Sequence, residues 1–206
     1  MKETATGDPG PAPLPPAPGA EQYRALDFVN TTLQLPGGRS QELLDSPAAA
    51  ARWLAEHDLI PADAQVYEPC TVRLRTLRDR LRELFAARVQ GEPAPEPALR
   101  AVNEALAGAP AAALLGWDPA LGLHRIQVHP LDRLVDHVLA VLAADAADLL
   151  TGPDADQLAA CSSTPCRRFL LRTHARRHWC SVRCGDRARA ARAYARRTRA
   201  GGPAEE

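Results

Sequence analysis

The sequence has few aromatic residues and no long apolar run, and both features limit the fold class and the location expected for the chain. Only nine of its 206 residues are Phe, Trp or Tyr, whereas alanine, leucine and arginine dominate. That mixture favours helices over sheets. No apolar run approaches the roughly 18–20 residues that cross a bilayer, so no membrane association is expected. Residues 1–20 are rich in proline and lack an apolar signal segment, which indicates a disordered tail.

The motifs of the common enzyme classes are also missing. The chain contains no Walker loop, no G-x-G-x-x-G, no H-E-x-x-H and no persuasive catalytic triad, so we do not expect an enzyme. Without a signal segment, the expected location is the cytoplasm, where thiols stay reduced. Clustered cysteines in that compartment are more often metal ligands than disulfides.

The formal net charge is zero, but the charge is unevenly divided along the chain. Residues 1–160 carry 13 basic and 22 acidic side chains, a formal charge of −9. Residues 161–206 carry 12 basic and 3 acidic side chains, a formal charge of +9. This division predicts a cationic module that meets a polyanion, attached to an acidic body with another role.

The spacing of apolar residues predicts a helical domain over residues 21–157. Its longest helix is expected over residues 63–89, where apolar residues recur at three- and four-residue steps along one stripe. Arg75, Arg78 and Arg82 of that helix are expected on a solvated face, because acidic residues lie among them. Further helices are predicted from residue 23 to about residue 36 and over 48–57, 98–107 and 131–149, and a β-hairpin over 114–117 and 123–128.

Four of the five cysteines fall in the last quarter of the chain as two close pairs: Cys161 and Cys166, then Cys180 and Cys184. Two turns, each offering two thiolates, can surround one tetrahedral ion, and soft thiolates favour zinc. Four protein ligands leave no open coordination position, so the spacing predicts one structural Zn²⁺. Cys70 lies on the apolar stripe of the long helix without a partner at ligand spacing, which indicates a core residue.

The segments between the cysteines predict a small finger over residues 158–199, followed by a tail over 200–206. The first cysteine pair resembles a zinc knuckle. Residues 168–173 are expected to form a strand, with residues 175–179 as its returning partner. The second pair is spaced four apart, which places both thiolates on one face of a helix. Knuckle, hairpin and helix in this order are typical of a treble-clef finger.

His174 and His178 offer an alternative ligand set together with the first cysteine pair. The seven-residue gap between Cys166 and His174 is short of the roughly twelve residues of a Cys2His2 finger. That ligand set would also leave the second cysteine pair without an ion, so ligation by four cysteines is favoured. A histidine-metal nuclease site is disfavoured, because no acidic partner lies near the two histidines.

The predicted finger helix carries a ridge of arginines. Between Cys161 and Arg199, twelve arginines accompany a single acidic residue, whereas a merely solvated helix face usually mixes both signs. We therefore expect contact with nucleic acid; a solvated or protein-facing basic surface is the alternative. The alanines between the arginines are expected to form a narrow packing face. The candidate nucleic-acid contacts are Arg176, Arg177, Arg183, Arg187, Arg189, Arg192, Arg196 and Arg199.

Two short motifs, Trp179-Cys180-Ser181 and Cys184-Gly185-Asp186-Arg187, resemble the signature of the CGNR zinc-finger proteins. These are bacterial proteins regarded as stress-induced transcription regulators. The segments that resemble their N-terminal ABATE-type domain are 25–31, 51–54 and 148–150. The resemblance covers about residues 22–199 and implies zinc at the four clustered cysteines and DNA binding by the finger. The family asparagine is Asp186 in this chain.

Together these observations predict a cytoplasmic, mainly helical bacterial regulator with a C-terminal zinc finger that binds duplex DNA. The N-terminal bundle is expected to sense a small-molecule effector or to form a homodimer. Asn30 and Thr31 are candidates for lining an effector pocket; alternatively, they satisfy backbone groups where a helix ends. Two other functions stay open: a zinc-stabilised module that binds an acidic protein surface, and RNA binding by the same arginines.

Overall fold

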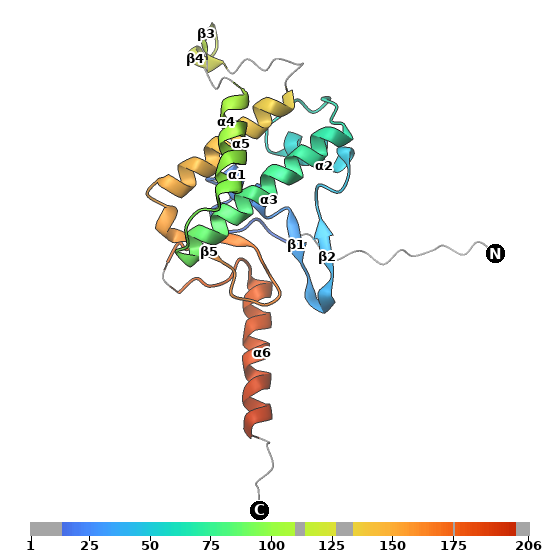
Figure 1. Ribbon diagram of the computed structural model, residues 1–206, viewed down its shortest axis with the longest axis vertical. Helices are drawn as coiled ribbons and strands as arrows, with labels where there is room; N and C mark the ends of the chain where they lie inside the picture. The colour runs from blue at the N-terminus through green and yellow to red at the C-terminus, as the bar shows by residue number, and fades with distance from the viewer. Residues whose placement is uncertain (1–13, 110–113, 127–133, 175, 201–206) are drawn as a thin grey trace, which may run out of the picture.

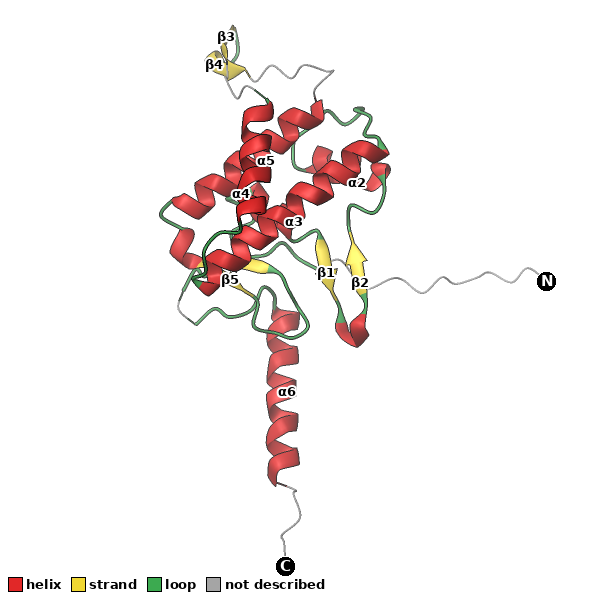
Figure 2. Ribbon diagram, viewed as in Figure 1, coloured by secondary structure: helices red, strands yellow, loops and turns green. Residues whose placement is uncertain are grey.

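The computed structural model describes residues 14–109, 114–126, 134–174 and 176–200. Its helices form one body, from which the last helix projects (Figure 1). The helices of the described residues are α1 (Arg24–Val29), α2 (Pro47–Glu56), α3 (Glu68–Gln90), α4 (Glu96–Gly108), α5 (Leu134–Thr151) and α6 (Val182–Ala200). The prediction of a mainly helical chain with small β elements is confirmed (Figure 2).

The long helix α3 is the centre of the body. It begins later than the predicted residue 63, because Pro69 sits in its first turn. It ends at Gly91, whose φ of 70° is a left-handed conformation that costs glycine no steric clash. The helices α4 and α5 pack against it, and α1 contacts both α3 and α5. The predicted apolar stripe is buried, and its members are Leu74, Leu77, Leu81, Leu84 and Phe85.

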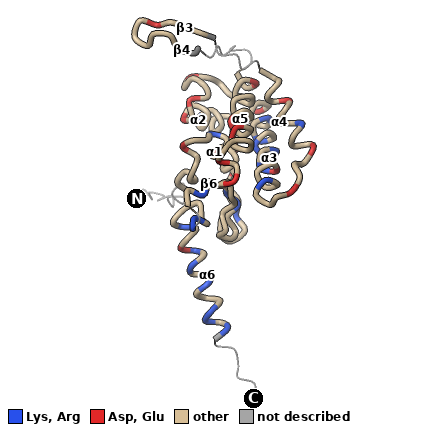
Figure 3. The backbone as a smooth tube through the Cα atoms, turned by 90° about the vertical axis from the view of Figure 1, so that its left-hand side faces the viewer, with Lys and Arg blue, Asp and Glu red and all other residues tan. Residues whose placement is uncertain are grey.

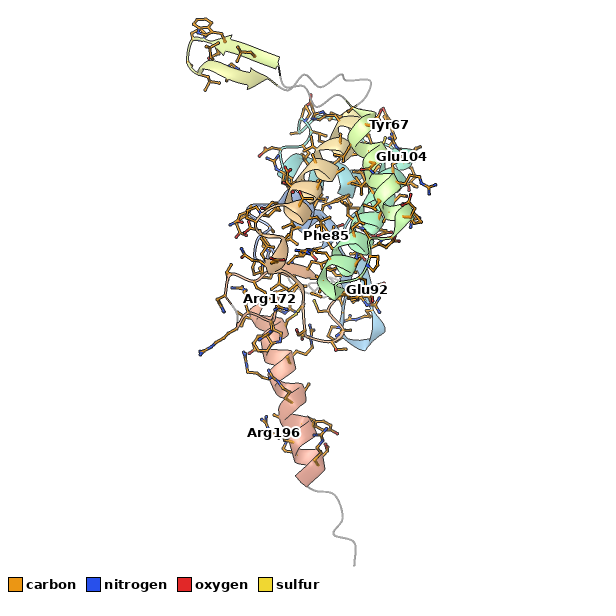
Figure 4. The ribbon with its side chains drawn as sticks, turned by 60° about the vertical axis from the view of Figure 1, so that its left-hand side comes forward. Tyr67, Phe85, Glu92, Glu104, Arg172 and Arg196 are labelled. Atoms are coloured by element: carbon orange, nitrogen blue, oxygen red, sulfur yellow. The ribbon has the colours of Figure 1, made fainter. Side chains whose placement is uncertain are left out.

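The core of the body is formed by apolar side chains from five helices. Phe28 of α1, Phe85 of α3 and Leu142 of α5 are fully buried, and Phe28 lies against Trp53 of α2 at 5.4 Å between ring centroids. Figure 4 shows Phe85 enclosed between the helices. Burial of apolar surface therefore stabilises the body. No helix among the described residues is long and apolar enough to span a membrane.

In the described part of the chain, three antiparallel strand pairs accompany the helices. The pairs are β1 (Thr32–Gln34) with β2 (Ser40–Glu42), β3 (Leu114–Asp118) with β4 (Gly122–Ile126), and β5 (Leu158–Ala160) with β6 (Phe169–Leu171). The β3–β4 pair confirms the predicted hairpin, although Val128, its predicted end, lies outside the described residues. The pair β1–β2 was not predicted, because three-residue strands are too short to show an alternating pattern. The helix expected to run from residue 23 to about residue 36 was predicted too long, since α1 ends at Val29 and β1 follows it.

The strand pairing of the finger differs from the prediction. The strand β6 pairs with β5, which precedes the first cysteine, and Ala159 lies opposite Leu170. The predicted partner, residues 175–179, contains no strand among its described residues, 176–179. That segment instead contacts the knuckle, where the Ser162 N–H donates to the His178 carbonyl at 2.9 Å. The strand β5 fills the edge of β6 because it continues directly from the body.

Residues 14–20, which were expected to belong to the disordered tail, lie against the finger as an N-terminal strap. The Leu171 N–H donates to the Pro18 carbonyl at 2.7 Å, and the Arg168 guanidinium donates to the Pro15 carbonyl at 2.9 Å. Ala17 is 1% exposed. Proline has no N–H to donate, but its carbonyl still accepts, so a proline-rich segment can pair along one edge.

The predicted solvated face of α3 is wrong for two of its arginines. Arg78 is 4% exposed, and its Nη1 donates to both carboxylate oxygens of Glu42 at 2.5 and 2.7 Å. Arg82 donates to the carbonyl of Val29 and, at 2.8 Å, to that of Arg167. Burial, and after it the like charge of Arg78, lowers the pKa of Arg82. Both arginines therefore connect α3 to other segments.

Candidate metal centre and basic helix

The four cysteines of the finger come together at the end of the body from which α6 projects. Cys161 directly follows β5, Cys166 ends the knuckle, Cys180 precedes α6, and Cys184 lies in the first turn of that helix. Their four sulfurs all lie within 4.8 Å of one another. Cys161, Cys180 and Cys184 are buried, with exposures of 7%, 2% and 2%. The spacing that predicted one ion thus corresponds to one cluster.

The sulfur separations fit a tetrahedral zinc ion. The Sγ atoms of Cys180 and Cys184 lie 3.6 Å apart, and those of Cys166 and Cys180 lie 3.7 Å apart. Zinc–thiolate bonds of about 2.3 Å in a tetrahedron place neighbouring sulfurs about 3.8 Å apart. Four thiolates with no water position make a closed, structural site. The protein accordingly takes one structural zinc.

The four thiols shift the pKa values of one another because their sulfurs lie so close. Hydrogen bonds with Cys166 and Cys180 lower the pKa of Cys161 to about 6. Hydrogen bonds with Cys161, Cys166 and Cys180 lower the pKa of Cys184 well below its usual range. A hydrogen bond with Cys161 raises the pKa of both Cys166 and Cys180. Because the thiolate is the form that binds zinc, a bound dication would displace the protons that the four thiols still carry.

Two arginines surround the sulfurs and balance their charge. Nη1 of Arg168, which is 3% exposed, lies 3.8 Å from Sγ of Cys180. Nη2 of Arg187 lies 3.0 Å from Sγ of Cys184, and its Nε donates to Ser163 Oγ at 3.1 Å. Four thiolates around zinc carry a net charge of about −2, which two guanidinium groups offset. Arg187 was predicted as a nucleic-acid contact, but its guanidinium lies against the metal centre.

The finger is joined to the body by the side chain of Asn30. Its Nδ2 donates to the Phe169 carbonyl at 2.9 Å, and its Oδ1 accepts from the Phe169 N–H at 2.8 Å. The Phe169 ring packs edge-on against Phe85 at 5.6 Å between centroids, and the Arg82 guanidinium lies over it at 5.3 Å. An asparagine can pair with a backbone in this way because its amide has one donor and one acceptor side.

The two candidate effector residues are both buried, Asn30 at 3% and Thr31 at 1% exposure. Thr31 Oγ1 donates to the Phe28 carbonyl at 2.8 Å and lies 3.4 Å from Nη1 of Arg78. Thr31 thus satisfies a backbone group where α1 ends, and Asn30 satisfies the backbone groups of Phe169 in β6. These contacts favour the backbone-satisfying alternative, and an effector pocket at Asn30 and Thr31 stays a prediction without support.

The helix α6 carries its charge away from the body. Figure 3 shows the basic residues spaced along it, and Figure 4 places Arg196 far from the helices of the body. At 1.5 Å per residue its 19 residues span about 28 Å. Arg189, Arg192, Arg196 and Arg199 are all exposed. The alanines expected to pack are not covered: Ala191 and Ala195 are exposed.

The first turns of α6 are ordered by contacts with Trp179. The guanidinium groups of Arg189 and Arg192 lie over its rings, 5.8 and 5.5 Å from a ring centroid. Asp186, which replaces the family asparagine, pairs with Arg189 at 2.5 Å. This exposed i, i+3 pair cancels one charge locally and contributes little to stability. The surplus of positive charge on α6 therefore lies on the arginines that follow Arg189 in the helix.

The remaining candidate contacts lie close to the metal centre. Arg176 is exposed and Arg177 is half-buried in the loop before Cys180, and Arg183 is exposed in the first turn of α6. His174 and His178 are exposed outside the cysteine cluster, and the described residues form no mixed cysteine–histidine group. The structure thus gathers the four cysteines and leaves both histidines on the surface.

A helical body joined to a four-cysteine finger with a basic helix defines a two-part zinc-finger protein. Comparison with known families agrees: residues 23–153 match the ABATE family, described as "Putative stress-induced transcription regulator", and residues 157–197 match the CGNR zinc finger. The chain belongs to the ABATE family and carries a CGNR zinc finger. No curated protein matches the chain significantly.

Two parts of the finger gave no recognisable signal in the sequence. The strap lies before both family matches, and its proline-rich composition is typical of disorder. Ala17 nevertheless packs in one cluster with Leu170 and with Cys161. Arg168 is one of many arginines, and only its position two residues after Cys166 hints at a place beside the metal centre.

Proposed function

We propose that this protein is a bacterial, cytoplasmic transcription regulator whose finger binds duplex DNA through α6. The single observation that carries the proposal is a helix with exposed arginines that projects from the body and makes no extensive contact with another helix of the described residues. An α-helix with its side chains fits the major groove of DNA, which is about 12 Å wide. The closed four-cysteine site supports a binding role rather than catalysis.

The charge of α6 supports a polyanionic partner. Arg192 and Arg196, and Arg196 and Arg199, are like charges at helical neighbour spacing, which destabilises a free helix. Phosphates on both sides of the helix would relieve that repulsion. If about six arginines neutralise phosphates, log K should fall with log[salt] at a slope of about −5 on duplex DNA. The helix should also gain helicity on binding, which circular dichroism measures.

The test is fluorescence anisotropy of the zinc-loaded protein with a random duplex at about 50 and 200 mM salt. Replacing Arg189, Arg192 and Arg196 with Gln should weaken binding at low salt and reduce the slope by about 2.7. The matched control replaces Arg52, Arg80 and Arg100 with Gln, which removes the same charge from the body. Equal losses for the two triple variants, or no binding at low salt, would refute the proposal.

The same measurement separates the two alternative partners. RNA binding needs aromatic rings on which bases stack. Phe169 is 5% exposed and Trp179 lies under two arginines, so Tyr194, at 64%, is the open aromatic of the three. Tighter binding of single-stranded RNA than of duplex DNA would favour the RNA alternative. An absence of binding to both would favour an acidic protein surface.

We also propose that the body senses a small apolar effector. The supporting observation is a hollow of about 350 Å³ between α3, α4 and α5, lined by Leu84, Val102 and Leu150 among others. Arg88 at its edge pairs with Asp156, two residues before β5, so an effector could influence the finger. A compound that raises the melting temperature of the wild type but not of Ala147→Phe, which fills the hollow, would establish the site.

Homodimer formation is proposed on the basis of the β3–β4 hairpin. Leu115, Trp117 and Leu123 on one face of it are 74%, 68% and 71% exposed. An isolated two-stranded hairpin is marginal in water, so a partner that covers this face would stabilise it. Sedimentation should show a dimer that Trp117→Ser dissociates and that Leu121→Ser, in the turn, leaves intact. A monomer at all concentrations would exclude it.

A further inference from the structure

A second feature of the finger is a hollow of about 470 Å³ beside the metal centre. It lies between the knuckle residues 162–164, Trp179 and the first turns of α6. The hollow is therefore bounded on one side by a loop and on the other by the basic helix. Both boundaries are fixed to the metal centre, because Cys161 and Cys166 flank the knuckle and Cys184 lies in α6.

The groups that line this hollow have the chemistry of a phosphate site. Ser162 and Thr164, two exposed knuckle residues with hydroxyl side chains, line the hollow, and Arg192 lines it from α6. His178 adds a further polar group at the edge. No acidic side chain is among the described residues that line the hollow. Hydroxyl and guanidinium donors that converge without a carboxylate select an anion with several acceptor oxygens.

The wall on the helix side leaves room for a close approach. Ala188 and Ala191, one turn apart on α6, line the hollow with methyl groups only. Arg187, between the hollow and Cys184, is held by Ser163 and by that sulfur. The cation at the base of the hollow is thus already oriented, and binding an anion need not order it.

We propose that this hollow receives a phosphodiester group of the DNA strand that α6 binds; the inference rests on the proposed DNA binding. Ser162 and Thr164 donate hydrogen bonds to the non-bridging phosphate oxygens, and Arg192 supplies the charge. The strand is then held from two sides, by the knuckle and by the arginine ridge of α6. Contacts of this kind fix the register of a protein on the duplex without reading bases.

The experiment introduces a carboxylate on the knuckle side of the hollow, away from α6. In the full-length, zinc-loaded protein, Ser162→Glu and Thr164→Glu should each weaken binding of a random duplex about tenfold at low salt, because like charges meet at short range. The matched control is Thr173→Glu, an exposed position of the finger outside the hollow, with the same change of charge. It should weaken binding by less than about threefold, since distant charges are screened.

A second variant removes only the hydroxyl groups. Ser162→Ala combined with Thr164→Val should weaken binding about fivefold without changing the salt slope, because a hydroxyl releases no counterion. Arg192→Gln should instead reduce the slope by about 0.9. Zinc content, measured by release of the ion with a mercurial, and circular dichroism show that each variant is folded. If a glutamate variant loses zinc, the hydroxyl variant alone decides.

The outcomes separate this inference from the proposed function. If the triple arginine variant loses DNA binding while the knuckle variants behave like Thr173→Glu, DNA binding stands and the phosphate site is refuted. If the wild type binds no DNA, both fail. Saturation of the free protein by a nucleoside monophosphate at micromolar concentration, followed by the fluorescence of Trp179, would assign the hollow to a free nucleotide and overturn the inference.

Discussion

The helical body and the zinc finger are stabilised by different forces. The body buries apolar side chains from five helices, with Phe28 and Phe85 fully enclosed. The separate core of the finger contains three of the clustered cysteines and only three other fully buried side chains, Ala17, Ala159 and Leu170. So small an apolar core contributes little stability by burial, although Leu158, Phe169 and Leu171 of the finger also pack into the core of the body. We therefore expect the finger to depend on its ion and the body not to.

Charge divides the two regions in the same way. The body is acidic and pairs its arginines with carboxylates, as Arg78 does with Glu42 and Arg88 with Asp156. On α6 the one carboxylate, Asp186, pairs with Arg189 and leaves the arginines beyond it in surplus. Like charges kept together on a protein surface repel one another and lower stability, but they attract a partner of opposite charge. Arginines of the body thus pair with its carboxylates, whereas the finger exposes a surplus of positive charge.

Removal of the zinc should have the largest effect, and it should affect the finger and the body differently. Zinc contributes about 10–16 kcal/mol to small zinc domains at neutral pH, so chelation or Cys184→Ser should disorder the finger and leave the body folded. Limited proteolysis should then cleave after the arginines of α6, while a fragment that ends near residue 157 resists. Circular dichroism should show the loss of one helix.

The matched control for this variant is Cys70→Ser. Cys70 lies partly buried on α3 and outside the cysteine cluster, so this variant should keep one zinc per chain and an intact α6. A protein that keeps its protease resistance without zinc would show that burial, not the metal, holds the finger.

Substitution of Asn30 tests how far the stability of the finger depends on its contact with the body. Asn30→Ala leaves the buried N–H and carbonyl of Phe169 without partners, which should cost about 2–4 kcal/mol. We expect thermal unfolding to separate into two transitions, with the finger melting first. Scanning calorimetry of the zinc-loaded protein measures this separation.

Thr31→Val is the control for Asn30, because Thr31 is equally buried and bonds only within the body. It should lower the melting temperature of the body without separating the transitions. A single unchanged transition in Asn30→Ala would mean that packing of Phe169 on Phe85 suffices to couple the regions.

What the sequence predicted depends on the range of the interaction involved. The stripe of α3 and the helix over 48–57, which α2 matches and which Ser46 Oγ caps by accepting from the Ala49 N–H, are local signals and were found. The four cysteines were also found, because a metal site needs fixed ligand types at short spacing. Local patterns of this kind identified the body and the metal centre.

The parts that the sequence did not reveal depend on contacts between distant segments. Arg78 and Arg82 look like their exposed neighbours in an arginine-rich helix; only the approach of Glu42 and of the Arg167 carbonyl buries them. The strap pairs with Leu171, more than 150 residues away, through proline carbonyls. No period or motif within either segment encodes such a contact.

A substitution in the strap is expected to have a smaller effect, and it tests whether the stability of the finger depends on this N-terminal segment. A Cβ on Gly19 would lie 2.5 Å from Leu171 Cγ, and the φ of Gly19 is +93°. Gly19→Ala should therefore destabilise the finger by about 1–3 kcal/mol through overpacking, in addition to its backbone strain. Gly38→Ala has a similar φ, +73°, with open space around it, and measures the strain alone. Equal melting temperatures for the two variants would show that the strap is dispensable.

The smallest expected effect concerns the contact between His57 and Asp27 in the body. His57 Nδ1 lies 2.7 Å from the Trp53 carbonyl and Nε2 lies 3.0 Å from Asp27 Oδ2. Burial alone would lower the pKa of His57, but these two acceptors outweigh it and raise the pKa above 6.5, because only the imidazolium donates from both nitrogens.

A raised pKa means that the charged form stabilises the fold at low pH. The contribution of His57 should be fully present below pH of about 6.5 and disappear as the pH rises through the pKa of the folded state. His57→Gln should therefore destabilise the body by less than about 1 kcal/mol at pH of about 5.5, and by still less at pH of about 8.5. Urea unfolding at both pH values measures this difference in the free energy of unfolding. Asp27→Asn should likewise lower the stability of the body more at the lower pH. A larger loss at high pH would contradict the assignment, because stacking of the ring on Trp53, at 3.9 Å between centroids, would then dominate.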